Sequence, residues 1–160
     1  MNVVDSSAWL EYLGDGPCAP EFASPIENTA DLVVPALTVY EVFKRTFQLT
    51  GETVALEAAA LMLQGRVVDV STALALDAAR ISLGEGLPMA DSIILATARS
   101  ESAVLWTQDA HFAGLDGVEY RAKQYTGPTA SGPCLGSPLG TRSTGTPAPG
   151  PAGRSRYRAE

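Results

Sequence analysis

Four carboxylates are the residues of this chain that could carry out chemistry together. Each stands at the end of an apolar run or in the early turns of a helical pattern: Asp5, Glu41, Asp91 and Asp109. Carboxylate oxygens are the ligands that Mg²⁺ and Mn²⁺ prefer, whereas zinc sites are built mainly from Cys and His. The two cysteines of the sequence form no metal-binding spacing. If the four acids meet in space, the sequence predicts a site for Mg²⁺ or Mn²⁺.

Asp91 has two explanations on local grounds. Pro88 suits the first position of a helix, and Ile94, Leu95 and Ala98 follow at helical spacing. Asp91 then lies in the first turn, where free N–H groups and the helix dipole favour an ionised carboxylate. It could cap the helix, or it could be a metal ligand or catalytic group at the mouth of a sheet. The rest of the chain has to decide between these two.

The elements that must position these acids are short strands alternating with helices over residues 1–123. Apolar runs predict strands at residues 2–5, 32–35, 67–70, 103–107 and 118–120. Helical spacing and breaking residues predict helices at residues 7–13, 21–28, 38–50, 53–63, 71–83 and 88–98, with Ser6 or Ser7 as the first cap. This alternation favours a three-layer α/β/α fold with a parallel sheet of about five short strands.

The predicted sheet brings the acids to one edge. Ligands of open parallel sheets bind beyond the carboxyl ends of the strands, where the strand order reverses. Asp5 ends the first strand, Glu41 follows the second, Asp109 follows the fourth, and the helix start with Asp91 reaches the same edge. Carboxylates so close would raise one another's pKa unless a cation neutralised them. The alternatives are local, with Asp109 as an ordinary turn residue and Glu41 as a solvated helix residue.

The charge of the chain limits how it can meet a nucleic acid. Residues 1–123 contain 7 Lys and Arg against 17 Asp and Glu, a formal charge of −10, whereas residues 124–160 carry +3. Broad electrostatic attraction to nucleic acid is therefore unfavourable for residues 1–123. An RNA substrate would require metal ions at the acids and a few basic residues on phosphates. Lys44 and Arg45 are candidates for RNA or partner contact; otherwise they form a solvated helix face.

Several other residues are weighed against simpler roles. His111 is the only histidine and follows Asp109 by two residues, which suggests a general base, but a single histidine in a polar turn is usually incidental. Aromatic residues expected in the core or at an interface are Trp9, Trp106, Tyr40 and Phe43, and Phe47 shares a helix face with the last two. Acids interpreted as surface charges are Asp77, Asp116 and Glu119. No apolar run approaches the roughly 20 residues of a membrane span, and no signal peptide is recognisable, so we expect a cytoplasmic protein without membrane contact.

Four segments carry the acids in a distinctive order and spacing: residues 3–10 (VVDSSAWL), 38–42 (TVYEV), 87–98 (LPMADSIILATA) and 106–112 (WTQDAHF). They resemble the signatures of PIN domains, and more narrowly those of VapC-type ribonuclease toxins of bacterial toxin–antitoxin pairs. The resemblance covers residues 1–123 and implies Mg²⁺- or Mn²⁺-dependent cleavage of RNA, often tRNA or rRNA. It also implies a homodimer that a cognate antitoxin protein controls. Family positions fall on Asp5, Glu41, Asp91 and Asp109 as acids, and on Ser6 and Thr107 as supporting hydroxyls.

Residues 124–160 differ abruptly from the rest of the chain. These 37 residues contain 7 Gly, 6 Pro and 9 Ser or Thr, without a periodic apolar pattern. Such a segment buries too little apolar surface to offset the entropy cost of ordering it. We predict a nuclease-like domain at residues 1–123 and a disordered, removable tail at residues 124–160. The tail departs from the family pattern, because such toxins usually end soon after the fifth strand.

Two other functions fit parts of the sequence. A phospho-receiver domain shares the alternation of strands and helices, and Asp69 on the third predicted strand would be its phosphoacceptor. That function calls for a pair of acids after the first strand, where Asp5 is followed by two serines, and it leaves the other acids without a role. The second alternative is a PIN-like module that binds without cleaving. All four acids are present, so nothing in the sequence favours an inactive protein.

Overall fold

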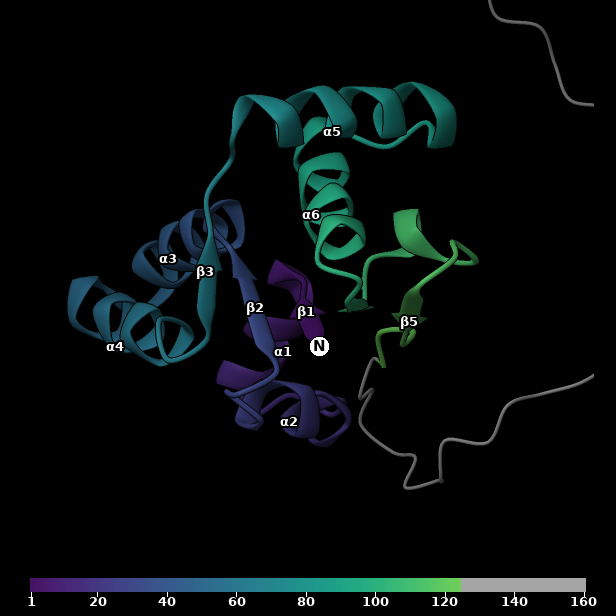
Figure 1. Cartoon of the computed structure of the whole chain (residues 1–160). Coiled ribbons are helices and arrows are strands. Elements are labelled where there is room, and N and C mark those ends of the chain that lie inside the picture. The colour runs from purple at the N-terminus through teal and green to yellow at the C-terminus, as the bar shows by residue number, and fades with distance from the viewer. Residues whose placement is uncertain (125–160) are drawn as a thin grey trace, which may run out of the picture. The chain divides into compact units, whose positions relative to one another are not determined.

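The computed structural model describes residues 1–124 (Figure 1). Segment 125–160, which holds nearly all of the predicted tail, lies outside the described residues. Within the described part, no helix is both long enough and apolar enough to cross a membrane.

Strands and helices alternate as the sequence predicts. The strands are β1 (Asn2–Val4), β2 (Leu32–Pro35), β3 (Arg66–Val68), β4 (Val104–Thr107) and β5 (Val118–Tyr120). The helices are α1 (Ser6–Leu13), α2 (Ala19–Glu27), α3 (Ala36–Thr50), α4 (Glu52–Met62), α5 (Thr72–Glu85), α6 (Met89–Ser100) and the 3₁₀ turn η1 (Ala110–Phe112). Every predicted element exists, and no predicted boundary is wrong by more than two residues.

All five strands belong to one parallel sheet, in the order β3-β2-β1-β4-β5. Val3 of the central strand lies opposite Val33 of β2 and Leu105 of β4. From β1 the chain adds β2 and β3 on one side, then crosses back through α5 and α6 to add β4 and β5 on the other. The strand order therefore reverses between β1 and β4, and a ligand site belongs at their carboxyl ends. The predicted three-layer α/β fold is confirmed.

Each face of the sheet has its own core, because successive residues of a strand point to opposite faces. Val4 packs in a cluster with Trp9 of α1 and Met62 of α4, whereas Val3 packs with Ile94 of α6 on the other face. Helices α1 to α4 thus cover one face, and α6 covers the other. Helix α5 packs against α6 rather than on the sheet, as Figure 1 shows.

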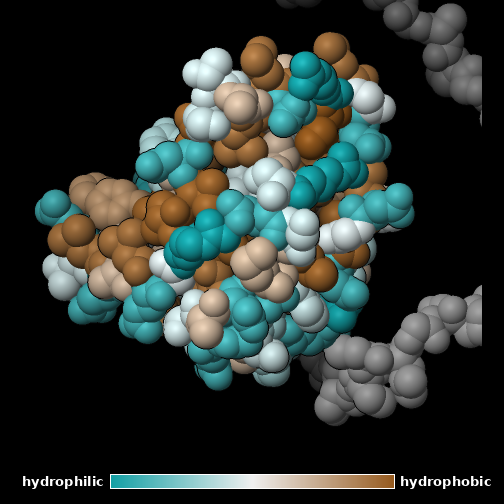
Figure 2. Space-filling model, viewed as in Figure 1, coloured by the Kyte–Doolittle hydropathy of each residue, from teal (hydrophilic) through white to brown (hydrophobic). Residues whose placement is uncertain are grey.

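The face that α3 buries is not the aromatic one, which the sequence assigned either to the core or to an interface. Thr38, Val42 and Thr46 are buried, whereas Tyr40 and Phe47 are 58% and 46% exposed. Both sets recur at helical spacing, so periodicity alone did not tell which one contacts the rest of the domain. Figure 2 shows apolar side chains gathered at the surface over α3 and α4, and again over α5.

Candidate metal centre

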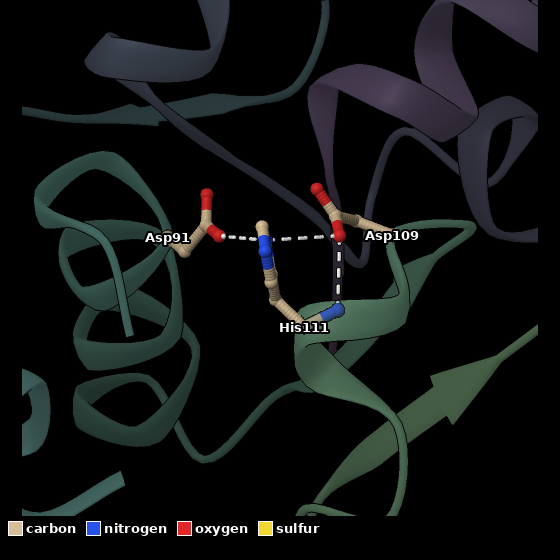
Figure 3. Close-up of side chains that lie close together, drawn as sticks. All are labelled: Asp91, Asp109 and His111. Atoms are coloured by element: carbon tan, nitrogen blue, oxygen red, sulfur yellow. Dashed lines mark hydrogen bonds and ion pairs between the residues drawn. The ribbon is translucent and has the colours of Figure 1, made fainter. Parts of the chain in front are cut away.

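Three side chains from distant parts of the chain meet beside the carboxyl edge of the sheet: Asp91, Asp109 and His111 (Figure 3). Asp109 follows β4 and caps η1 by accepting the backbone N–H of His111 at 2.9 Å. Nδ1 of His111 lies 3.1 Å from Oδ2 of Asp91 and 3.1 Å from Oδ1 of Asp109. One ligand atom from each residue lies within 4.8 Å of the other two, a spacing that a single metal ion can span.

The start of α6 places Asp91 in this group. Pro88 is the N-cap of α6 rather than its first residue, and its extended backbone (φ −54°, ψ 158°) turns the chain into the helix. Ser92 is 1% exposed, and its Oγ donates to the carbonyl oxygen of Pro88 at 2.7 Å. With Ser92 turned inward, Asp91 lies in the first turn, as predicted, and faces His111 (Figure 3).

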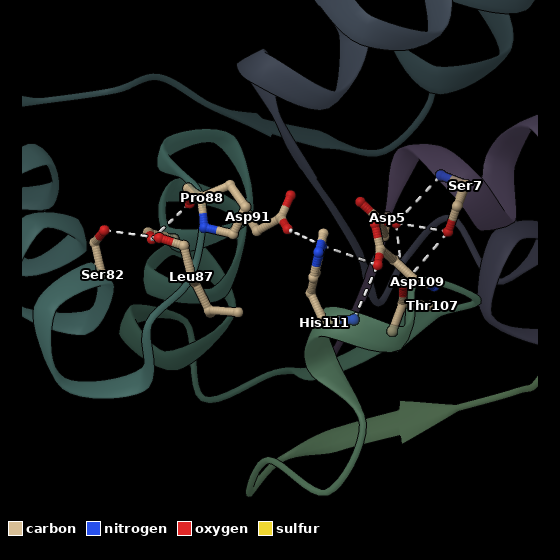
Figure 4. Close-up of polar contacts among 10 residues, drawn as sticks. Asp5, Ser7, Ser82, Leu87, Pro88, Asp91, Thr107, Asp109 and His111 are labelled. Atoms are coloured by element: carbon tan, nitrogen blue, oxygen red, sulfur yellow. Dashed lines mark hydrogen bonds and ion pairs between the residues drawn. The ribbon is translucent and has the colours of Figure 1, made fainter. Parts of the chain in front are cut away.

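Asp5 is held by hydrogen bonds at the end of β1 (Figure 4). It is 3% exposed and caps α1, a role that the sequence assigned to Ser6 or Ser7. Its Oδ2 accepts bonds from the N–H of Ser7 at 3.2 Å, from Oγ of Ser7 at 2.6 Å and from Oγ1 of Thr107 at 3.0 Å. No residue in the described part of the chain donates to Oδ1 of Asp5. Oδ1 is therefore the oxygen left for a ligand.

Thr107 joins the ends of the two central strands. Its fully buried hydroxyl donates to Asp5 after β1 and accepts the backbone N–H of Asp109 at 2.9 Å. Ser7 adds a second link, because its Oγ accepts the N–H of Gln108 at 3.1 Å. Since β1 and β4 are neighbours, these bonds fix Asp5 relative to Asp109 across the point where the strand order reverses.

Glu41 and Asp91 are electrostatically coupled to the other acids. Burial is the main cause that raises the pKa of Glu41; a hydrogen bond with Ser6 lowers it, and the charges of the other three acids raise it. Burial also raises the pKa of Asp91, and the charges of Asp109 and Asp5 add to this. The charges of the neighbouring acids thus reach Glu41 and Asp91, and Asp91 and Asp109 form a tighter group with His111. Of the two predicted supporting hydroxyls, that of Thr107 donates a hydrogen bond to Asp5, and that of Ser6 lowers the pKa of Glu41.

The donor set of this site suits a divalent cation. No Lys or Arg within residues 1–124 forms an ion pair with any of the four acids, because the Arg ion pairs all involve other carboxylates. A cluster of acids without cationic side chains is what a bound metal ion would neutralise. Carboxylate oxygens with one imidazole nitrogen are ligands that Mg²⁺ or Mn²⁺ can use. The residues present therefore fit either ion.

A groove of about 720 Å³ adjoins the acids. Its lining includes Ser7 and Asp109 together with Arg45 of α3 and Lys123, which follows β5. Within the described residues, neither Arg45 nor Lys123 forms an ion pair, so both can contact an anion. Lys44, the other predicted contact, instead lies over the Tyr40 ring, 5.6 Å from its centroid.

Three residues near the site were not predicted: Ser7 as a partner of Asp5, His111 as a neighbour of two acids, and Lys123. In both Asp5-x-Ser7 and Asp109-x-His111, an aspartate that begins a helical turn brings the residue two positions later to its own carboxylate. That Asp-x-donor spacing was the available signal, because aspartate commonly bonds to the backbone two residues ahead. Lys123 had no such signal, since only the pairing of β5 with β4 brings it to the groove.

The fold and the site together define a small three-layer α/β domain with an acidic cluster at the switch point of its sheet. The PIN domain family matches residues 3–118, so the chain belongs to the PIN domain family. No curated protein matches the sequence significantly. The phospho-receiver alternative is not supported. Asp69 follows the edge strand β3, and its charge is not among the causes that shift the pKa of Glu41 or of Asp91.

Solved structures share this fold at low sequence identity. A toxin–antitoxin complex from Klebsiella pneumoniae is 20% identical, with 74% of this chain and 96% of that chain covered and a TM-score of 0.61. VapC20 of Mycobacterium tuberculosis, described as a sarcin-ricin loop cleaving toxin, is 20% identical over 74% and 98% of the two chains, with a TM-score of 0.62. VapBC2 of Rickettsia felis, bound to a DNA fragment from their promoter, is 12% identical over 76% and 97%, with a TM-score of 0.58. These similarities establish the fold.

Proposed function

We propose that this PIN domain is a Mg²⁺- or Mn²⁺-dependent endoribonuclease and the toxin of a type II toxin–antitoxin pair. The observation that carries the proposal is the acidic cluster at the strand reversal, which no Lys or Arg of the described residues neutralises. Membership of the PIN family and the fold shared with VapC toxins support RNA as the substrate. The residues proposed to hold the metal are Asp5, Glu41, Asp91 and Asp109.

The side chains around the acids have positioning roles in this proposal. When bound, the cation supplies positive charge to the scissile phosphodiester and activates a water molecule for in-line attack. Thr107 and Ser7 hold Asp5 through one oxygen and keep the other available. Ser6 supports the ionised form of Glu41, because it lowers the pKa of that carboxyl. Because water rather than the ribose 2′-hydroxyl is the nucleophile, no 2′,3′-cyclic phosphate forms. The resemblance to VapC-type toxins implies products with 5′-phosphate and 3′-hydroxyl ends.

The groove beside the acids would supply the phosphate contacts that an acidic domain otherwise lacks. Arg45 and Lys123 line it, and Asp109 belongs to both the groove and the acidic cluster. A single RNA strand with phosphates on Arg45 and Lys123 would therefore pass the proposed metal ligands. Arg45 and Lys123 would position the strand without reading its sequence, because contacts to phosphates carry no sequence information.

We propose a cognate antitoxin protein and a second copy of the chain as partners, in the cytoplasm. An apolar groove of about 370 Å³ between α1, α3 and α4 is lined by Leu49, Val54 and Leu61, among others, and would take the apolar face of an antitoxin segment. Trp9 is fully buried and cannot contribute to such an interface, contrary to one of the sequence interpretations. An arginine of the antitoxin would pair with the acids of the cluster, since a guanidinium group binds a carboxylate through two parallel hydrogen bonds.

The proposal is tested by metal dependence and by one isosteric variant. We expect the full chain to cleave total cellular RNA with Mg²⁺ or Mn²⁺ and to lose this activity in EDTA. Asp5→Asn removes a ligand charge at constant size and should lower the cleavage rate about 100-fold or more with the circular dichroism spectrum unchanged. Asp77→Asn is the matched control, because Asp77 is an exposed residue of α5 that pairs with Arg80.

Full cleavage in EDTA, or by Asp5→Asn, would contradict the metal-nuclease function. Retained RNA binding without cleavage in either metal would instead indicate a PIN-like module that only binds. Sequencing of RNA 5′ ends after brief induction in cells would identify the target and decide between tRNA and rRNA. Light scattering of the pure chain tests the homodimer, which a monomer at high concentration would contradict.

A further inference from the structure

His111 occupies a position between two carboxylates that a hydrogen bond alone does not explain. Its Nδ1 lies 3.1 Å from both Asp91 and Asp109 (Figure 3). Nδ1 carries at most one hydrogen, so it can make a linear hydrogen bond with only one of the two oxygens. The second carboxylate then faces the same nitrogen without a hydrogen of its own. A cation close to all three atoms would satisfy the nitrogen and both oxygens together.

The spacing of these three atoms also matches that of neighbouring ligands on one ion. Ligand atoms at right angles around an ion, each about 2.1 Å from it, lie about 3.0 Å apart. Both nitrogen-to-oxygen distances are 3.1 Å, and all three atoms fall within 4.8 Å of one another. The arrangement is also fixed by the backbone, because Asp109 accepts the N–H of His111 and the two side chains share one short turn.

We propose that His111 is a direct ligand of the divalent cation through Nδ1 and that it shifts the metal preference of the site from Mg²⁺ towards Mn²⁺. This inference rests on the proposed metal-dependent function and adds a nitrogen to its all-carboxylate ligand set. Imidazole nitrogen binds transition metals far better than it binds Mg²⁺, which prefers oxygen ligands. The side chain of His111 is 59% exposed, so water can accept a hydrogen from the remaining ring nitrogen.

The single histidine of the chain makes this inference directly measurable. Untagged, metal-free full-length protein is titrated with Mn²⁺, and the fall in the free-ion electron paramagnetic resonance signal gives the affinity. Pulsed electron paramagnetic resonance then detects any nitrogen bound to the ion, and in this chain a histidine nitrogen can only be that of His111. Competition with Mg²⁺ gives the affinity of the second ion. The variants are His111→Ala and His111→Asn, of which the second keeps a hydrogen-bond donor near the place of Nδ1.

We expect a directly bound nitrogen in the wild-type protein and in the Asp77→Asn control, and none in either His111 variant. The Mn²⁺ affinity should fall about tenfold in both variants, while the Mg²⁺ affinity changes less than about twofold. If His111 only positioned the acids through hydrogen bonds, His111→Asn would restore the affinity for both ions equally, and that result would overturn the inference.

Two further outcomes separate this inference from the proposed function. If Mn²⁺ binds and Asp91→Asn weakens it, but no bound nitrogen is detected, His111 is not a ligand and the metal-dependent nuclease still stands. If the free Mn²⁺ signal is unchanged by the protein, no metal binds, and both the inference and the proposed function are wrong.

Discussion

Single residues of the acidic cluster are stabilised to different degrees. Asp5 receives three hydrogen bonds on one oxygen, so its charge is compensated within the domain. Glu41 and Asp91 are half-buried next to other acids, and the pKa of each is raised. In the folded protein without metal, the ionised forms of Glu41 and Asp91 are therefore less favourable than in water. A bound cation would remove this cost.

Glu41→Gln tests how much the ionised Glu41 carboxylate destabilises the metal-free fold, through the dependence of stability on pH. The folded pKa of Glu41 is raised above the ordinary value of 4.5, so its contribution to stability is present below pH 4.5 and is lost as pH rises through the raised pKa. In EDTA at neutral pH, the variant should melt at a higher temperature than wild type, and the difference should vanish below the ordinary pKa. With Mg²⁺ or Mn²⁺ the order should reverse, because the metal binds the ionised acid.

Differential scanning fluorimetry from pH 4 to 8 measures this effect, and the exposed Glu57→Gln on α4 is the control. A variant that melts below wild type in EDTA at neutral pH would show that Glu41 is stabilised by partners other than metal.

At the scale of elements, the site depends on how the ends of β1 and β4 are joined. Thr107 bonds to Asp5 and to the backbone of Asp109, so one hydroxyl links two strands and two acids. The groove likewise needs several elements, because α1, α3, the segment after β4 and the segment after β5 each contribute to its lining. Neither feature belongs to a single segment of the sequence.

Thr107→Val should separate positioning from folding. Valine keeps the shape but removes the hydroxyl, leaving Asp5 with one donor fewer and the N–H of Asp109 unpaired. We expect cleavage to fall about ten- to a hundredfold and the free energy of unfolding to fall about 1–3 kcal/mol. Thr97→Val is the matched control, because that buried hydroxyl bonds only to a carbonyl of its own helix. Equal loss of activity in the two variants would contradict the positioning role.

Arg45→Gln and Lys123→Gln test whether the groove holds RNA. Each variant should weaken RNA binding, and each should reduce the slope of log affinity against log salt by about 0.7, the value for one phosphate contact on a single strand. Fluorescence anisotropy of a labelled RNA in Ca²⁺ or EDTA measures binding without turnover. Arg80→Gln on α5 is the control, because Arg80 already pairs with Asp77. Unchanged slopes would mean that the RNA follows another path.

At the scale of the whole molecule, the described residues 1–124 include the whole five-stranded sheet and the helices that cover it. The cores on the two faces of the sheet are built from residues between Val3 and Val118. We therefore expect a chain ending at Gln124 to keep the melting temperature within about 2 °C and to keep the cleavage activity, as the sequence predicted for the loss of its tail.

Truncation at Gly117 is the contrasting control, because it removes β5 and its pairing with β4. Differential scanning calorimetry compares the three chains. A cooperative loss of stability on removal of residues 125–160 alone would show that this segment contributes to the fold.

The sequence by itself determined the elements of this protein and the identity of its acids. Apolar runs, helical spacing and breaking residues are local signals, so all five strands and six α-helices within residues 1–124 were predicted with small errors at their ends. The expectation that Asp5, Glu41, Asp91 and Asp109 lie at one edge came from one rule about parallel sheets, applied to acids at element ends. Their family pattern agrees with the match over residues 3–118.

Only the tertiary structure decided how these side chains are used. Thr107 and Asp5 are 102 positions apart in the chain, so their bond exists only because β1 and β4 pair in one particular register. The same is true of His111 beside Asp91, which depends on η1 following β4 next to the start of α6. Side-chain partners at such separations are selected by packing and strand register rather than by local propensity. For that reason the sequence predicted which acids to consider together, and the structure showed the hydrogen bonds and distances that position them.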